Sequence, residues 1–211
     1  ETLGGIDSLL VLAVDHNKLK TLPEGLKFLK NIKYLFAQNN QINHLPEIFS
    51  EWAQLINLCL ENNKIESLPQ SFTDLYDLEL LRLEHNNIKT LPQDIGKLKK
   101  IKKLYLHHNN IEELPNTIGF LEELEVVELS QNKIKVLPEN FGNLKKIKEL
   151  SLESNRLREL PASFKNLIFL KEINLDKNLF NEFPSILCEI GSLEIIKLNH
   201  NRIQSIPDNL D

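Results

Sequence analysis

The chain lacks most features of membrane-spanning, glycosylated and disulfide-bonded proteins. Its 211 residues include two cysteines, one tryptophan, seven glycines and no methionine. No apolar run approaches the roughly 18 residues of a transmembrane helix, so we expect no membrane insertion. No Asn-x-Ser/Thr acceptor occurs, which argues against a glycosylated animal or plant receptor ectodomain. The missing methionine suggests a processed or trimmed chain.

Motifs of catalytic and nucleotide-binding sites are also missing. The sequence has no phosphate-binding loop, no H-E-x-x-H, no G-x-S-x-G and no dinucleotide fingerprint. We therefore predict no enzyme activity, no catalytic residue and no cofactor. The net charge of −5 gives no general reason to bind nucleic acid or an anionic membrane.

What the chain does contain is an uninterrupted repeat. Its nine prolines are spaced 23 residues apart, at Pro23, Pro46, Pro69, Pro92, Pro115, Pro138, Pro161, Pro184 and Pro207. An asparagine precedes each by six residues, at Asn17, Asn40, Asn63, Asn86, Asn109, Asn132, Asn155, Asn178 and Asn201. Such a period indicates one supersecondary unit stacked about nine times, so we predict a single repeat domain over residues 1–211.

Apolar residues follow one pattern around each asparagine. The fourth unit reads Leu78-x-x-Leu81-x-Leu83-x-x-Asn86-x-Ile88-x-x-Leu91-Pro92-x-x-Ile95-x-x-Leu98. This pattern resembles the leucine-rich repeat family in its 23-residue Leu-Pro form. The resemblance implies an α/β fold, a right-handed solenoid or horseshoe with a parallel β-sheet on its concave face and short 3₁₀ or helical turns on its convex side. Similar repeats occur in bacterial proteins, including those of spirochaete pathogens, and in Ras-binding scaffolds.

Physical chemistry accounts for the same pattern. Leu81 and Leu83 alternate with Arg82, as in a short strand with one buried face. The asparagine amide can satisfy backbone groups at the bend after the strand, in its own unit and a neighbouring one. The proline offers no N–H, so the return leg cannot be a second sheet strand. Trp52 replaces an aliphatic residue of other units and is therefore expected in the core.

Both ends of the domain look truncated or uncapped. Leu3 matches a convex position of a preceding unit, and Asp211 falls inside a unit. Solenoid ends need polar caps, so we expect more chain or a partner at one end or both. The oligomeric state we expect is a monomer or weak end-to-end association. Cys59 and Cys188 lie more than five units apart. At roughly 4.8 Å per strand this exceeds about 25 Å, too far for a disulfide.

Outward-facing strand positions are free of the repeat's structural demands, so binding residues are sought there. In units one to five these positions combine aromatic and apolar residues with an arginine, a composition typical of interface hot spots. The candidates for partner binding in this half are Tyr34, Phe36, Glu61, Leu80, Arg82, Glu84, Tyr105 and His107. The alternative is ordinary strand composition, because strands favour aromatics and single exposed apolar residues are common.

Units six to eight are acidic on the same face. The candidates there are Glu128, Glu149, Glu153, Glu172 and Asp176. Like charges on adjacent strands destabilise a sheet, so this zone predicts a partner with a basic surface. The alternative is a solvated face of an acidic protein.

A zinc site between His85 and His108, with Glu84 or His107 as further ligand, is a weaker hypothesis. No compact motif supports it, so we predict no metal site.

The sequence therefore predicts a non-catalytic module that binds a protein or peptide on its concave face. The favoured interpretation is a bacterial protein, secreted or surface-exposed rather than cytoplasmic, directed at a host or envelope protein. One alternative is a cytosolic signalling scaffold of the Ras-binding type. Another is the targeting domain of a larger enzyme.

Overall fold

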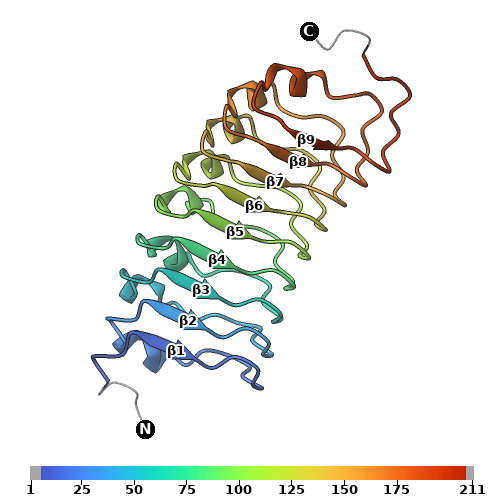
Figure 1. The fold of residues 1–211 in the computed structure, drawn as a ribbon. Helices are drawn as coiled ribbons and strands as arrows, with labels where there is room; N and C mark the ends of the chain where they lie inside the picture. The colour runs from blue at the N-terminus through green and yellow to red at the C-terminus, as the bar shows by residue number, and fades with distance from the viewer. Residues whose placement is uncertain (1–5, 208–211) are drawn as a thin grey trace.

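Nine three-residue strands form one parallel sheet in chain order in the computed structural model, which describes residues 6–207 (Figure 1). They are β1 (Val11–Ala13), β2 (Tyr34–Phe36), β3 (Asn57–Cys59), β4 (Leu80–Arg82), β5 (Lys103–Tyr105), β6 (Val126–Glu128), β7 (Glu149–Ser151), β8 (Glu172–Asn174) and β9 (Ile195–Lys197). Each residue of β1 to β8 pairs with its equivalent one unit later, as Leu81 does with Leu104. The repeat period is therefore also the sheet register. Leu3 and Asp211, which suggested open ends, lie outside the described residues.

After each of the first eight strands the chain bends and returns through a short 3₁₀ turn. The turns are η1 (Glu24–Phe28), η2 (Phe49–Glu51), η3 (Gln70–Asp74), η4 (Ile95–Lys97), η5 (Asn116–Phe120), η6 (Glu139–Asn143), η7 (Ala162–Asn166) and η8 (Ser185–Glu189). The repeat proline often stands directly before the turn in an extended conformation, as Pro115 does at φ −66°. Its ring and missing N–H keep the return leg out of the sheet.

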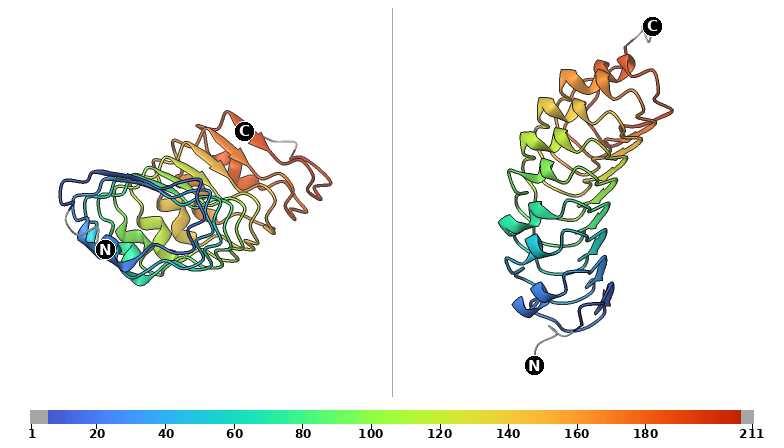
Figure 2. Two further views of the ribbon diagram at one scale, coloured as in Figure 1. Left: turned by 90° about the horizontal axis from the view of Figure 1, so that it is seen from below. Right: turned by 90° about the vertical axis from the view of Figure 1, so that its left-hand side faces the viewer.

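The sheet lines the inner side of a shallow arc, and the turns lie on the outer side (Figure 2). The coil is right-handed, so the predicted α/β solenoid with a concave parallel sheet is confirmed. No helix among residues 6–207 is long and apolar enough to cross a membrane.

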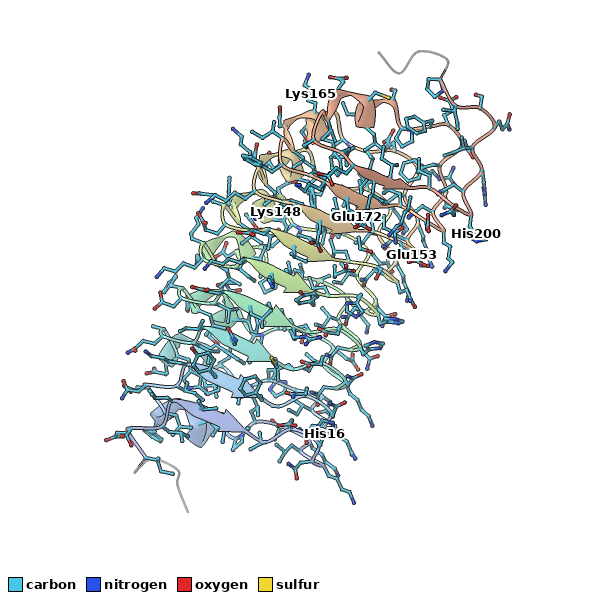
Figure 3. The ribbon with its side chains drawn as sticks, viewed as in Figure 1. His16, Lys148, Glu153, Lys165, Glu172 and His200 are labelled. Atoms are coloured by element: carbon cyan, nitrogen blue, oxygen red, sulfur yellow. The ribbon has the colours of Figure 1, made fainter. Side chains whose placement is uncertain are left out.

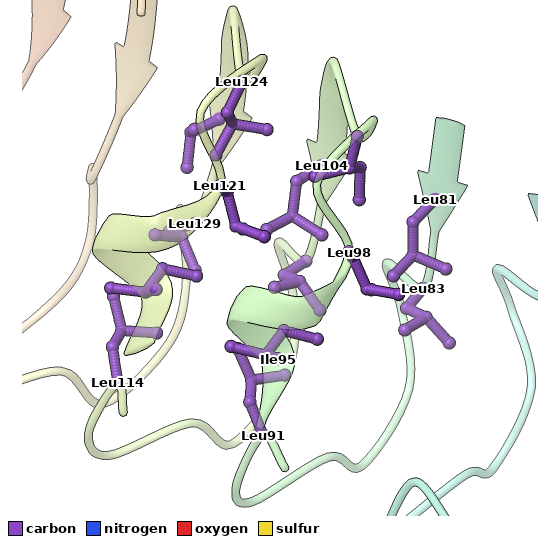
Figure 4. Packing of buried hydrophobic residues seen from close by; sticks show 14 of the residues in the cluster. Leu81, Leu83, Leu91, Ile95, Leu98, Leu104, Leu114, Leu121, Leu124 and Leu129 are labelled. Atoms are coloured by element: carbon purple, nitrogen blue, oxygen red, sulfur yellow. The ribbon is translucent and has the colours of Figure 1, made fainter. Parts of the chain in front are cut away.

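One continuous hydrophobic core fills the space between sheet and turns (Figure 4). Leu81 and Leu104 reach it from the strands, and Ile95 and Leu98 from the return leg. Trp52 is fully buried, as predicted, and its Nε1 donates to the Leu26 carbonyl at 3.1 Å. This core holds the strands, and hence the concave surface, in a fixed register.

Candidate functional site

The concave surface consists of columns of side chains that run across the sheet. Within β4, Leu80 and Arg82 are partly exposed, whereas Leu81 between them is buried. A further column is formed by the residues that lie two positions after the end of each strand; Glu84 is the one that follows β4. Because the strands pair in register, each column places equivalent residues of neighbouring units side by side.

The asparagine of each interior unit holds the bend after the strand. Asn109 Nδ2 donates to the carbonyl oxygens of Leu83 at 2.9 Å and Leu106 at 3.0 Å. Its Oδ1 accepts from the Ile88 N–H at 2.9 Å. One side chain thereby links its own unit to the preceding one, so the ladder positions the concave columns rather than contacting a ligand.

The residue before each asparagine has a backbone feature that sequence reasoning missed. It adopts the left-handed conformation in all nine units, with φ between 53° and 58°. These residues are His16, Asn39, Asn62, His85, His108, Gln131, Ser154, Lys177 and His200. Asparagine and histidine tolerate this region better than most side chains. The frequent histidines here, which had suggested a metal site, therefore have a local conformational reason.

Aromatic side chains and an arginine gather on β2, β4 and β5. Tyr34, Phe36 and Tyr105 are partly exposed on the concave side, as is Leu80. The guanidinium carbon of Arg82 lies 5.3 Å from the centroid of the Tyr105 ring, a cation–π contact. We call these five residues the aromatic–arginine cluster. It presents apolar area and hydrogen-bond donors together, which suits contact with another protein.

Arg82 also interacts with two carboxylates. Its Nε and Nη2 donate to Glu84 Oε1 at 2.9 and 2.6 Å, and its Nε lies 3.9 Å from Glu61 Oε1. Glu84 is only 3% exposed, so it orients Arg82 and offers little surface of its own. Burial raises the pKa of Glu61, and the negative charge of Glu84 adds to this effect while Arg82 opposes it.

Three histidines pack against one another beside this cluster. The rings of His85 and His108 stack with centroids 4.0 Å apart, and His107 lies edge-on to His85 at 5.5 Å. Burial lowers the pKa of His107 and of His108, and the proximity of His85 lowers both further. Over residues 6–207, no group of three or more His, Cys, Asp or Glu residues is arranged to hold a metal ion.

The acidic strands contain ion pairs that the sequence analysis did not anticipate. Glu149 and Glu172 face each other across β7 and β8, as the register predicted. However, Lys197 Nζ lies 2.6 Å from Glu172 Oε1, and Lys177 Nζ lies 2.7 Å from Glu153 Oε1. Figure 3 shows where Glu153 and Glu172 lie on the molecule. Each lysine comes from the following unit and offsets part of the expected repulsion.

Of the remaining acidic candidates, Asp176 also has a partner within the chain. Asp176 Oδ1 accepts from the Asn199 backbone N–H at 2.6 Å. Glu128 lies with Glu149, Glu172 and Lys197 at a hollow of about 180 Å³ on the concave side. The acidic zone is therefore a mixed surface in which several carboxylates already have donors.

Glu128→Gln should raise the thermal unfolding midpoint at pH 7. Burial is the main cause that raises the pKa of Glu128, and Glu149 and Glu172 add to it against a hydrogen bond from Ser151. Because the pKa of Glu128 is higher in the folded than in the unfolded chain, ionisation of this carboxyl lowers the free energy of unfolding as pH rises through its pKa in the folded chain. The gain from glutamine should disappear near pH 3, where both forms are neutral. A midpoint unchanged or lowered at pH 7 would contradict this assignment.

Comparisons with known proteins agree with this geometry. A sequence model of the leucine-rich repeat region matches residues 66–157 and 93–206. None of the curated proteins matches the chain. Among solved structures, the leucine-rich repeat ectodomain of the plant membrane receptor kinase GASSHO1/SCHENGEN3 from Arabidopsis thaliana, in complex with CASPARIAN STRIP INTEGRITY FACTOR 2, is 32% identical. The match covers 95% of this chain and 25% of that chain, with a TM-score of 0.84.

Two bacterial structures are also similar. An internalin from Listeria monocytogenes is 21% identical over 97% of this chain and 58% of its own, with a TM-score of 0.86. A leucine-rich repeat protein of Leptospira interrogans is 27% identical over 97% of this chain and 64% of its own, with a TM-score of 0.59. The chain thus spans less than two thirds of each of these proteins. The fold they share is a typical module for protein–protein recognition.

Proposed function

This chain belongs to the leucine-rich repeat family, and we propose that it is a non-catalytic module that recognises a protein or peptide on its concave surface. The aromatic–arginine cluster carries this proposal. Tyr34, Phe36 and Tyr105 remain partly exposed although the core beneath them is complete without their rings. Large rigid side chains beside an arginine provide much of the binding energy in protein interfaces. Support also comes from the Arabidopsis ectodomain, which was solved in a complex.

We further propose that the module acts as one recognition domain of a bacterial protein directed at a host or envelope protein. Its uninterrupted 23-residue units are rich in asparagine, isoleucine and lysine. The likeness to the Listeria and Leptospira structures supports the same assignment. In this proposal β2 to β5 anchor the partner, and the acidic residues of β6 to β8 attract its basic groups.

The triple variant Tyr34→Ala, Phe36→Ala, Tyr105→Ala should lose the partner that the parent chain captures. Each truncation removes apolar contact area, and a central hot-spot residue contributes about 2 kcal/mol or more, so three should abolish capture. The measurement is affinity capture with mass spectrometry, using extracts of the source organism and of candidate hosts as the sources of prey.

A matched control removes three aromatics from the turn side instead. Tyr76, Phe120 and Phe169 are 51%, 46% and 55% exposed. The variant Tyr76→Ala, Phe120→Ala, Phe169→Ala should capture the same partner as the parent. Capture that is equal with both triple variants, or lost only with the control, would move the binding surface away from the concave side.

A further inference from the structure

Most of the buried polar atoms that lack a hydrogen-bond partner lie in one column of the concave surface. Four of the five such side-chain atoms among the described residues are Gln38 Oε1, Glu61 Oε2, Glu84 Oε2 and His107 Nδ1. They occupy equivalent positions in four successive units. Buried polar atoms in folded proteins are nearly always paired. Three of these four are oxygens that only accept, so the missing partner is a donor.

The charges at this column are also unbalanced. Both hydrogen bonds of Arg82 go to Glu84 Oε1, whereas Glu61 Oε1 lies 3.9 Å from Arg82 Nε, too far for a hydrogen bond. Two largely buried carboxylates thus share one guanidinium. By contrast, Glu153, which follows β7, and Glu172 of β8 each have a lysine within 2.7 Å.

The carboxylate of Glu61 is enclosed by its neighbours but not completely covered. The side chain of Glu61 is 12% exposed and that of Arg82, 3.9 Å away, is 42% exposed. Cys59 is small and stands between Phe36 and Arg82 in the column of third strand residues. Burial raises the pKa of the Cys59 thiol to about 12, so it adds no charge there. Arg82 is held by the Tyr105 ring at 5.3 Å and by its hydrogen bonds to Glu84, so a cation has to approach Glu61 from the side of Phe36 and Cys59.

We propose that a lysine or arginine side chain of the partner binds at Glu61, between Phe36 and Arg82, as the second positive charge of the Glu61–Arg82–Glu84 cluster. This inference rests on the proposed recognition function and specifies its chemistry. The incoming cation pairs with the Glu61 carboxylate, whose buried Oε2 is brought within reach by rotation of the Glu61 side chain, and the Phe36 ring lies alongside the stem of the cation. The sequence analysis expected the basic groups of the partner at units six to eight; this proposal places one of them beside β3 and β4.

A small cation tests this site without knowledge of the partner. The ¹⁵N-labelled 211-residue chain is titrated with n-butylguanidinium, and n-butylurea serves as the uncharged match of similar shape. We expect saturable amide shifts confined to β2–β5 with the cation and none with the urea. Glu61→Gln should weaken binding of the cation about tenfold or more, because a charge-assisted hydrogen bond is lost. Glu113→Gln, an exposed carboxylate outside the concave columns, should bind as the parent does.

The pH dependence supplies a second readout. A bound cation favours the ionised form of Glu61, so binding should weaken as pH falls through the pKa of that residue. The charged groups facing it are Arg82, Glu84 and Asp15, and Asp15 and Glu84 both raise its pKa. Glu61→Gln should remove this dependence.

Three results would overturn the proposal. They are equal shifts with the urea, shifts confined to β7–β9, and undiminished cation binding by Glu61→Gln. None of them bears on the capture experiment, which depends on the aromatic side chains. A failure at Glu61 is therefore distinguishable from a failure of concave-surface recognition.

Discussion

Replacing Gly119 by alanine should lower the free energy of unfolding by about 3 kcal/mol. Gly119 is buried in η5, where an added Cβ would overlap the backbone carbonyl of Asn140 in the next unit. Backbone held in a turn cannot move aside as a flexible side chain can, so units five and six must separate. Urea unfolding followed by circular dichroism would measure the loss. A weakened interface in mid-array should also broaden the transition, since stacked units fold through their contacts with neighbours.

Gly25 provides a matched control for this substitution. It also lies in a 3₁₀ turn, η1, but a Cβ built on it meets nothing within 4 Å. Gly25→Ala should leave stability unchanged or slightly higher, because alanine restricts the unfolded chain. If the two alanine variants unfolded at the same urea concentration, the explanation that close contact between successive turns requires glycine at position 119 would be wrong.

Asn109→Ala should cost roughly 1–3 kcal/mol, the penalty of leaving a buried polar group unpaired. The carbonyls of Leu83 and Leu106 each keep a second donor, from Asn86 and Asn132. The Ile88 N–H, in contrast, loses the acceptor Asn109 Oδ1. Thermal unfolding would report the total, and amide hydrogen exchange at Ile88 would show whether the opening is local.

Two further variants separate the parts of this effect. Asn109→Asp keeps an acceptor for the Ile88 N–H but removes both donor hydrogens. The rate of amide hydrogen exchange at Ile88 should therefore stay closer to that of the parent than it does in Asn109→Ala. Asn17 is exposed and donates only to Val14 and Asp15 of its own unit. Asn17→Ala should therefore cost much less than Asn109→Ala. Equal costs would mean that the ladder does not link neighbouring units.

The repetitive part of this structure was predictable from particular residues. Pro115 and Pro138 are 23 residues apart. This repeat spacing predicted the sheet register, in which Lys103 pairs with Val126 at the same separation. The buried position of Trp52 followed from the aliphatic residues at its place in other units. The repeat also contains Gly96, Gly119 and Gly142 one unit apart, yet nothing in the chain itself showed that successive turns touch there. That contact depends on the spacing between units.

The candidate site was predictable only in outline. Alternation along the strands placed Tyr34, Phe36 and Tyr105 on the concave side, where they are partly exposed. It also placed Glu84 there as a contact residue, but Glu84 is buried beneath Arg82. A two-residue period gives the side to which a residue points, whereas burial depends on the length and rotamer of its neighbours.

The sequence by itself determined the stacked unit, the parallel sheet and the concave columns of this protein. A strict period leaves one way to bury every apolar position, so register follows from spacing alone. Only the tertiary structure decided which charges are matched, with Lys177 at Glu153, Lys197 at Glu172 and a single guanidinium for Glu61 and Glu84. Pairing across units depends on side-chain conformations, and partners distant in the chain come within hydrogen-bond distance only after the units have stacked.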